Sequence, residues 1–276
     1  MSNPALKKRV ITALILAPIA ISLVLLIPTF GWAIVTAVLC LLALWEWSRL
    51  SGLRDRRVRG VLLALYLTAM GLLWIYRGST FYWALIIVGA LWWLIAIFWL
   101  RHFSYGAAHT PENTRIKLLV GLLMVLPAWT ALVELHQSQP YGHFWALLAI
   151  MLVWAADTFA YFTGVRFGKT KLAPNISPGK TREGALGGLV GAGLTVLVGG
   201  WLLGVHGWAL LPLLILGLIS VSFSIIGDLF ESLIKRHANV KDSGAMFPGH
   251  GGVFDRLDAI FAAMPVFVIG KTLLGL

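Results

Sequence analysis

The sequence predicts an all-α integral membrane protein that crosses the bilayer about nine times. Its 276 residues are 59 % hydrophobic and only 12 % charged, and the mean hydropathy is +0.87. A typical soluble domain is about half apolar and has roughly twice this share of charged residues. Apolar runs of about 20 residues, the length that spans the hydrocarbon core as a helix, recur along the whole chain.

Breaks at Arg, Lys, Pro and Gly divide these runs into nine expected helices. The expected helices begin near Val10, Thr29, Val61, Phe81, Leu118, Phe144, Gly184, Trp208 and Ala259. The first run follows Lys7, Lys8 and Arg9, as a signal peptide would, but no small-residue cleavage site closes it. We therefore expect it to be a retained helix.

The basic residues predict how the helices are oriented. With a cytoplasmic N-terminus, all of the 22 Lys and Arg residues except Arg77 and Lys271 fall on the cytoplasmic side. Cytoplasmic loops normally carry this excess. We therefore expect a cytoplasmic N-terminus and a periplasmic C-terminus. The net charge of +11 then reflects contact with anionic lipid headgroups, and we expect no nucleic-acid partner.

The two halves of the chain differ in character. Residues 1–143 contain plain apolar helices, which we interpret as a scaffold with possible dimer contacts. Residues 144–276 contain two basic or acidic cytoplasmic loops, and we interpret them as the catalytic region. Asp157 lies inside an apolar helix of this half, where an ionisable residue either serves function or hydrogen-bonds a neighbouring helix. The spacing of Gly184, Gly187, Gly188 and Gly191 predicts close helix packing, whereas Trp92 and Trp93 are expected to face lipid.

Five of the eleven carboxylates gather near the end of the chain: Asp228, Glu231, Asp242, Asp255 and Asp258. Burying carboxylates near lipid is costly unless they bind cations or substrate. A continuing helix would place Glu231, Ser232 and Lys235 on one face with Asp228, and Asp255 has the same i, i+3 relation to Asp258. Such a cluster suits Mg²⁺ with phosphates, although salt bridges at the membrane surface are the plainer alternative.

Two loops offer groups that bind phosphate. The segment Gly249-His250-Gly251-Gly252 has flexible backbone N–H groups, and His250 is either an added donor or a surface histidine. The loop after the sixth helix contains Ser177-Pro178-Gly179-Lys180-Thr181 among five cations. This loop is not a P-loop, because Pro174 stands where the upstream glycine is required and no strand is expected before it.

These segments resemble those of one enzyme family. Ser232-Leu-Ile-Lys-Arg, Lys241-Asp-Ser-Gly and Pro248-Gly-His-Gly-Gly-Val-Phe-Asp-Arg-Leu-Asp closely resemble the signature of the bacterial phosphatidate cytidylyltransferases, also called CDP-diacylglycerol synthases. Asp157-Thr-Phe-Ala-Tyr-Phe-Thr-Gly and Ile176-Ser-Pro-Gly-Lys-Thr-Arg-Glu-Gly resemble other recurring segments of this family. The chain departs from the family at Gly179, where a lysine is usual before Lys180, and at Arg182, where an aromatic residue is common.

The resemblance implies transfer of a cytidylyl group from CTP to phosphatidate, giving CDP-diacylglycerol and pyrophosphate. It also implies Mg²⁺ with a second neighbouring cation, contact with membrane lipids, a homodimer, and an active site on the cytoplasmic face of the inner membrane. The metal ligands expected are Asp228, Asp255 and Asp258. The catalytic residues expected are Asp228, Lys235, Arg236, Lys241, Asp242, His250, Asp255 and Arg256. The substrate-binding residues expected are Asp157, Ser177, Lys180, Thr181, Ser232, Gly251 and Gly252.

Three other functions fit parts of the sequence. A CTP-dependent lipid-alcohol kinase would share the nucleotide and the metal. In that reaction the lipid would attack the γ-phosphorus of CTP. A CDP-alcohol phosphotransferase would show the pattern D-G-x-x-A-R, which the sequence lacks. A secondary transporter could use Asp157 as an ion ligand, but such proteins are built from repeats that this chain does not show.

Overall fold

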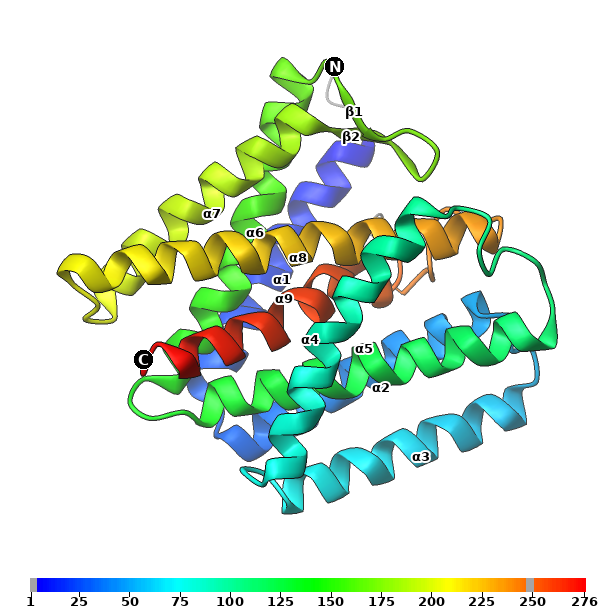
Figure 1. Cartoon of the computed structure of the whole chain (residues 1–276), viewed down its shortest axis with the longest axis horizontal. Coiled ribbons are helices and arrows are strands. Elements are labelled where there is room, and N and C mark those ends of the chain that lie inside the picture. The colour runs from blue at the N-terminus through cyan, green and yellow to red at the C-terminus, as the bar shows by residue number, and fades with distance from the viewer. Residues whose placement is uncertain (1–3, 247–250) are drawn as a thin grey trace.

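The computed structural model describes residues 4–246 and 251–276, with side chains from Leu14 onward. Over these residues it contains nine α-helices and one two-stranded sheet (Figure 1). The helices are α1 (Pro4–Leu26), α2 (Thr29–Leu50), α3 (Arg56–Ile75), α4 (Thr80–Arg101), α5 (Pro111–Gln137), α6 (Gly142–Phe167), α7 (Arg182–Leu202), α8 (Leu210–His237) and α9 (Phe254–Leu273). The strands are β1 (Lys171–Ala173) and β2 (Ser177–Thr181), and the short 3-10 helix η1 (Gly207–Ala209) precedes α8. Helix α9 lies at the centre and packs against α2, α4, α5, α6 and α8.

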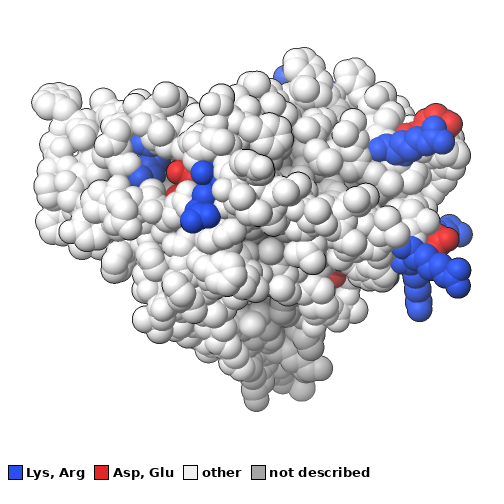
Figure 2. Space-filling model, turned by 90° about the horizontal axis from the view of Figure 1, so that it is seen from below, with Lys and Arg blue, Asp and Glu red and all other residues white. Residues whose placement is uncertain are grey.

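The surface and the helix lengths identify a polytopic membrane protein, as the sequence predicts. Seven helices, α2 to α8, are long and apolar enough to cross a bilayer. Helix α1 adds an apolar stretch from Leu14 to Leu26, and α9 is 20 residues long. Figure 2 shows one face of the molecule, on which a large group of charged side chains lies at the right edge and a smaller group lies toward the left, with a broad and mostly uncharged surface between them. This distribution suits a surface that contacts lipid tails between two aqueous ends.

Several helices begin earlier than the apolar runs alone suggest, because polar residues cap their first turns. Thr110 accepts a hydrogen bond from the backbone N–H of Asn113 at 3.3 Å, so α5 begins at Pro111 rather than near Leu118. Asp55 caps α3 in the same way through the N–H of Arg57 at 2.7 Å. Such caps satisfy backbone donors that the helix itself leaves unpaired.

Aromatic side chains from the first half surround the part of α8 that leads to the functional site. The rings of Trp92, Trp93 and Trp99 lie edge-on to Phe230, with centroids 5.9, 6.0 and 5.5 Å away. Trp93 is 1 % exposed and donates its indole N–H to the carbonyl of Phe261 at 3.2 Å. The expectation that Trp92 and Trp93 face lipid is therefore wrong, since both side chains are buried. Their rings pack against Phe230 of α8, and the indole N–H of Trp93 bonds α9.

Glycines bring α6 and α7 into close contact, which confirms the packing predicted from their spacing. A side chain at Gly188 would place its Cβ 3.0 Å from the carbonyl oxygen of Ala156, and one at Gly191 would lie 2.5 Å from the ring of Phe159. The absence of a side chain at these positions lets the two helices approach closely. Most of these glycines therefore pack against other residues of the same chain.

The segment between α6 and α7, expected to be a loop, is instead a short β-hairpin. Strands β1 and β2 pair antiparallel, with Lys171 opposite Thr181. Two side chains fix the hairpin to α7. Glu183 accepts hydrogen bonds from the N–H groups of Lys169 and Thr170 at 3.0 and 3.1 Å, and Thr181 caps the helix by accepting from the N–H of Gly184 at 3.1 Å. These contacts, which hydropathy patterns do not reveal, hold Lys180 beside Asp228 of α8.

The contact between α6 and α7 gives a testable expectation. Gly191→Ala should destabilise the protein by about 1–3 kcal/mol because its methyl group would overlap the ring of Phe159. Gly71→Ala in α3 is the matched control, because nothing lies within 4 Å of its added Cβ. Melting temperatures in detergent should fall for the first variant alone, and equal melting temperatures would contradict the close packing.

Candidate active site

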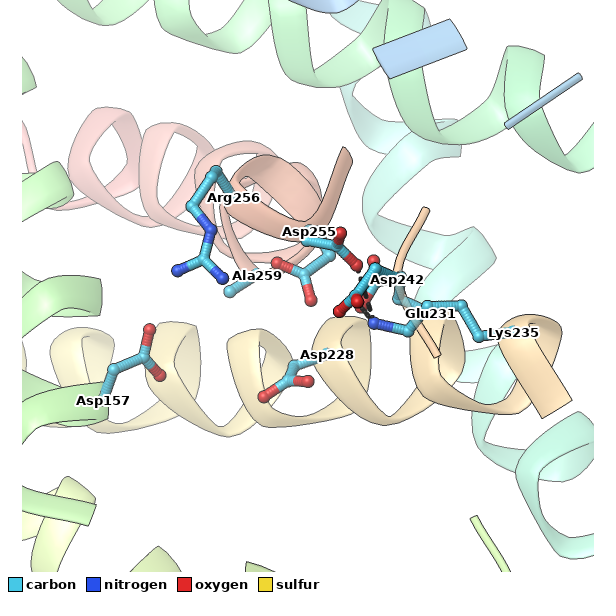
Figure 3. A pocket seen from close by; sticks show the side chains of 9 residues that line it. Asp157, Asp228, Glu231, Lys235, Asp242, Asp255, Arg256 and Ala259 are labelled. Carbon is cyan, nitrogen blue, oxygen red and sulfur yellow. Dashed lines mark hydrogen bonds and ion pairs between the residues drawn. The ribbon is translucent and has the colours of Figure 1, made fainter. Parts of the chain in front are cut away.

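A polar cavity of about 210 Å³ lies where α6, α8 and the start of α9 meet. Its walls are formed by Asp157, Asp228, Glu231, Lys235, Asp242, Asp255, Arg256, Asp258 and Ala259. Figure 3 shows Asp228, Glu231 and Lys235 along one helix, as the expected α-helical spacing requires, and Asp157 facing the cavity from another helix. The fold thus brings together eight of the residues that the sequence singles out.

Three carboxylates in this cavity are close enough to share a metal ion. One oxygen each from Asp228, Glu231 and Asp258 lies within 4.8 Å of the others. Glu231 and Asp258 are buried, at 2 % and 7 % exposed. The Oε1 atom of Glu231 has no hydrogen-bond partner among the described residues. A buried carboxylate oxygen of this kind is a suitable ligand for a hard cation, so the residues fit Mg²⁺.

Asp255, which was expected in the metal set, is engaged by other groups. Its Oδ1 atom accepts from the ammonium of Lys235 at 2.7 Å. Its Oδ2 atom accepts from the N–H groups of Gly252 and Ser243 at 2.7 and 3.0 Å. The structure therefore places Glu231 in the acidic trio and gives Asp255 the contacts of a residue that organises the preceding loop.

The cations of the site are arranged around these acids. Lys235 lies 2.7 Å from both Glu231 and Asp255, so it links the acidic trio to the loop. Lys180 of β2 forms an ion pair with Asp228. In Figure 3 the guanidinium of Arg256 points into the opening between Asp157 and Asp228. Positive charge therefore reaches the cavity from both α9 and the hairpin.

The other expected site residues lie around the cavity. Arg236 donates from Nε to the carbonyl of Ile176 at 3.1 Å and so connects α8 to the hairpin. Gly251 has a φ of 80°, a left-handed conformation that favours glycine. The remaining positions are a half-buried Ser177 in β2, the capping Thr181, a buried Ser232 and an exposed Lys241. His250 lies outside the described residues.

Two residues of α2 contact the loop before α9, and the sequence analysis missed both. Glu46 accepts hydrogen bonds from the hydroxyl of Ser243 and the N–H of Phe254, each at 2.8 Å. Arg49 donates to the carbonyl of Ser243 at 2.7 Å. The rule that singled out Asp157, an ionisable residue within an apolar helix, would also have found Glu46. The first half of the chain therefore contributes to the site.

Known proteins are similar to this chain over almost its whole length. The cytidylyltransferase family matches residues 7–273. A phosphatidate cytidylyltransferase of Pseudomonas aeruginosa is 40 % identical over 262 residues, which cover 95 % of each chain. The chain belongs to the phosphatidate cytidylyltransferase family. Another phosphatidate cytidylyltransferase, from Haemophilus influenzae, is 33 % identical over 95 % of this chain and 97 % of its own.

Another phosphatidate cytidylyltransferase matches about half of the chain. The protein from Thermotoga maritima is 41 % identical over 135 residues, or 47 % of this chain and 50 % of its own. The family resemblance inferred from the sequence is thus confirmed. The roles of individual site residues remain predictions.

Removal of one member of the acidic trio should weaken cation binding. We expect Glu231→Gln to reduce the affinity for Mn²⁺ about tenfold or more, since an unpartnered carboxylate oxygen is lost. Asp242→Asn is the matched control, because Asp242 lines the same cavity but lies outside the trio. Free Mn²⁺ can be measured by electron paramagnetic resonance in detergent. A larger effect of Asp242→Asn would place the cation elsewhere in the cavity.

Proposed function

We propose that this chain transfers the cytidylyl group of CTP to phosphatidate, releasing pyrophosphate and forming CDP-diacylglycerol for phospholipid synthesis. The observation that carries the proposal is the similarity to phosphatidate cytidylyltransferases over 95 % of the chain. The acidic cavity supports the same chemistry independently. Membership of this family makes the protein a nucleotidyltransferase.

The charge of the cavity supports a metal-dependent reaction of anionic substrates. Six carboxylates but only two cations line it. A triphosphate and a phosphomonoester would be repelled from such a site unless cations entered with them. Asp228, Glu231 and Asp258 would hold Mg²⁺, and the resemblance to the family implies a second cation beside it. Bound there, Mg²⁺ would neutralise phosphate charge and act as a Lewis acid at phosphoryl oxygens.

The size of the cavity suggests which part of the substrates it receives. Sites that enclose a whole small ligand are usually about 300–1,000 Å³, larger than the 210 Å³ found here. We infer that the cavity receives the reacting phosphates, while the cytidine lies over the loops and the acyl chains remain in lipid. Lys180 of the hairpin contacts Asp228 of the cavity wall, so the hairpin lies beside the cavity.

The chemistry requires alignment more than proton transfer. A phosphatidate oxygen, already anionic at neutral pH, forms a bond to the α-phosphorus of CTP. The bond from that phosphorus to the oxygen bridging the β-phosphate breaks, and pyrophosphate leaves with the electron pair. Arg256 in the cavity wall and Lys180 at its edge can bind the phosphates in line for this displacement. Lys235 holds the surrounding acids in place, and Asp157 closes the membrane side of the cavity.

The proposal also concerns where the protein works. We infer that the hairpin and the loop before α9 face the cytoplasm of a bacterial inner membrane, with the N-terminus on the same side. The support is the concentration of Lys and Arg in the segments that connect the helices on this side. A homodimer is inferred from the resemblance to the family alone.

The activity can be tested on purified protein in detergent micelles. With CTP and phosphatidate we expect Mg²⁺-dependent release of pyrophosphate, with CDP-diacylglycerol identified by mass. Asp228→Asn should abolish turnover because it removes a charge from the acidic trio, whereas Glu112→Gln at the exposed start of α5 should not. CDP in place of pyrophosphate would indicate a lipid kinase. No product from folded protein would refute the proposed activity.

The orientation can be tested with single cysteines. Cys40 is the one cysteine of the chain, so Cys40→Ala gives a background for Gly179→Cys in the hairpin and Leu273→Cys at the end of α9. An impermeant maleimide added to spheroplasts should label the second position and reach the first only after permeabilisation. The opposite pattern would reverse the proposed topology.

A further inference from the structure

A buried carboxylate of the first half holds the loop that leads into the active site. Glu46 belongs to the apolar helix α2 and is 8 % exposed. Its Oε2 atom accepts from the hydroxyl of Ser243 and from the backbone N–H of Phe254, both at 2.8 Å. These hydrogen bonds connect residues about 200 positions apart along the chain. A charged acceptor makes such bonds stronger than neutral ones.

The loop is shaped to receive this carboxylate. Side chains at Gly244 or Gly252 would each place their Cβ 2.6 Å from the Cδ atom of Glu46. The backbone at Gly244 and at Gly252 therefore lies against the carboxyl group with no room for a side chain. Arg49, one turn further along α2, holds the carbonyl of Ser243 at 2.7 Å. Helix α2 therefore contacts the loop through both Glu46 and Arg49.

Ser243 connects Glu46 to the active site through direct contacts. Its hydroxyl donates to Glu46, and its N–H donates to Asp255 at 3.0 Å. Asp255 in turn binds Lys235, which lies 2.7 Å from Glu231 of the acidic trio. An unbroken series of hydrogen bonds and ion pairs therefore runs from α2 to the candidate metal ligands.

Glu46 also acts as the side-chain cap of α9. The residue before this helix, Val253, makes no side-chain capping bond. Glu46 instead accepts from Phe254, the first residue of the helix. A negative charge at a helix N-terminus is stabilised by the unpaired N–H groups there. The first two turns of α9 present Asp255, Arg256 and Asp258 to the cavity, so this cap fixes where they stand.

We propose that Glu46 is a positioning residue of the active site, acting through Ser243 and the start of α9. Among the described residues it forms no hydrogen bond with the acidic trio, and it does not line the cavity. Its effect on catalysis is to hold the loop and α9 so that Asp258 and Arg256 face Asp228. This inference rests on the proposed function for its catalytic part, and on the contacts alone for its structural part.

The experiment compares Glu46→Gln with Ser243→Ala and the double variant. Glu46→Gln should lower kcat about 100-fold, the effect of misplacing reacting groups by about 1 Å, with little change in KM for phosphatidate. If both residues act through their shared hydrogen bond, the double variant should be no slower than the slower single variant. Glu134→Gln, a half-buried acid of α5 that contacts Gln137, is the matched control and should retain full activity.

Loop mobility gives a second measurement that does not depend on activity. A spin label attached after Met246→Cys in the Cys40→Ala background should become more mobile in both single variants and not in Glu134→Gln. Met246 is 52 % exposed, so the label need not disturb packing. Unchanged mobility in the Glu46 and Ser243 variants would overturn the proposal, even where activity falls.

The remaining outcomes are equally decisive. Additive losses of activity in the double variant would mean that Glu46 and Ser243 act separately, which contradicts the proposal. If Glu46→Gln does not fold, Ser243→Ala alone must still raise the mobility of the label. Inactive wild-type protein with the expected mobility changes would refute the proposed reaction while retaining the loop attachment.

Discussion

The structure depends on compensating the burial of several carboxylates within a bundle of apolar helices. Burial of an unpaired carboxylate is costly, so each one must gain partners that replace water. Asp255 gains an ammonium and two backbone N–H groups, and Glu46 gains a hydroxyl and a helix terminus. The trio that includes Glu231 stays incompletely paired among the described residues. The candidate active site is therefore the place where bound cations and substrate would supply the missing partners of the carboxylates.

The apolar helices supply the rigidity that this arrangement needs. Phe230 immediately precedes Glu231, and its ring is enclosed by tryptophans of α4. The orientation of α8 is therefore fixed one residue away from the acidic trio. Helix α4 also holds α9 through the hydrogen bond from Trp93 to Phe261. The division at residue 143 remains a prediction about function, but the packing and the Glu46 contacts cross it.

Much of the fold and part of the site follow from sequence because helical periodicity is local. The i, i+3 spacing was enough to place Glu231 beside Asp228 on α8. It was not enough to show that Asp255 turns back to its own loop, because that depends on how residues near Ser243 fold. The hairpin was missed because β1 has three residues and no alternating pattern. Glu46 could have been found by the rule that singled out Asp157, but its partners could not, because they lie about 200 residues further along the chain.

The hydrogen bond between Glu46 and Ser243 also has a consequence for biosynthesis. Helix α2 is synthesised before Ser243 and Phe254, which follow Glu46 by about 200 residues. Before that segment is made, Glu46 lacks the hydroxyl of Ser243 and the N–H of Phe254 as donors. Glu46 lacks the same donors in any chain truncated before Ser243. An acid without hydrogen-bond donors inside an apolar helix is costly in a membrane. The environment of α2 is therefore completed only when the segment that follows α8 has been synthesised and has folded against Glu46.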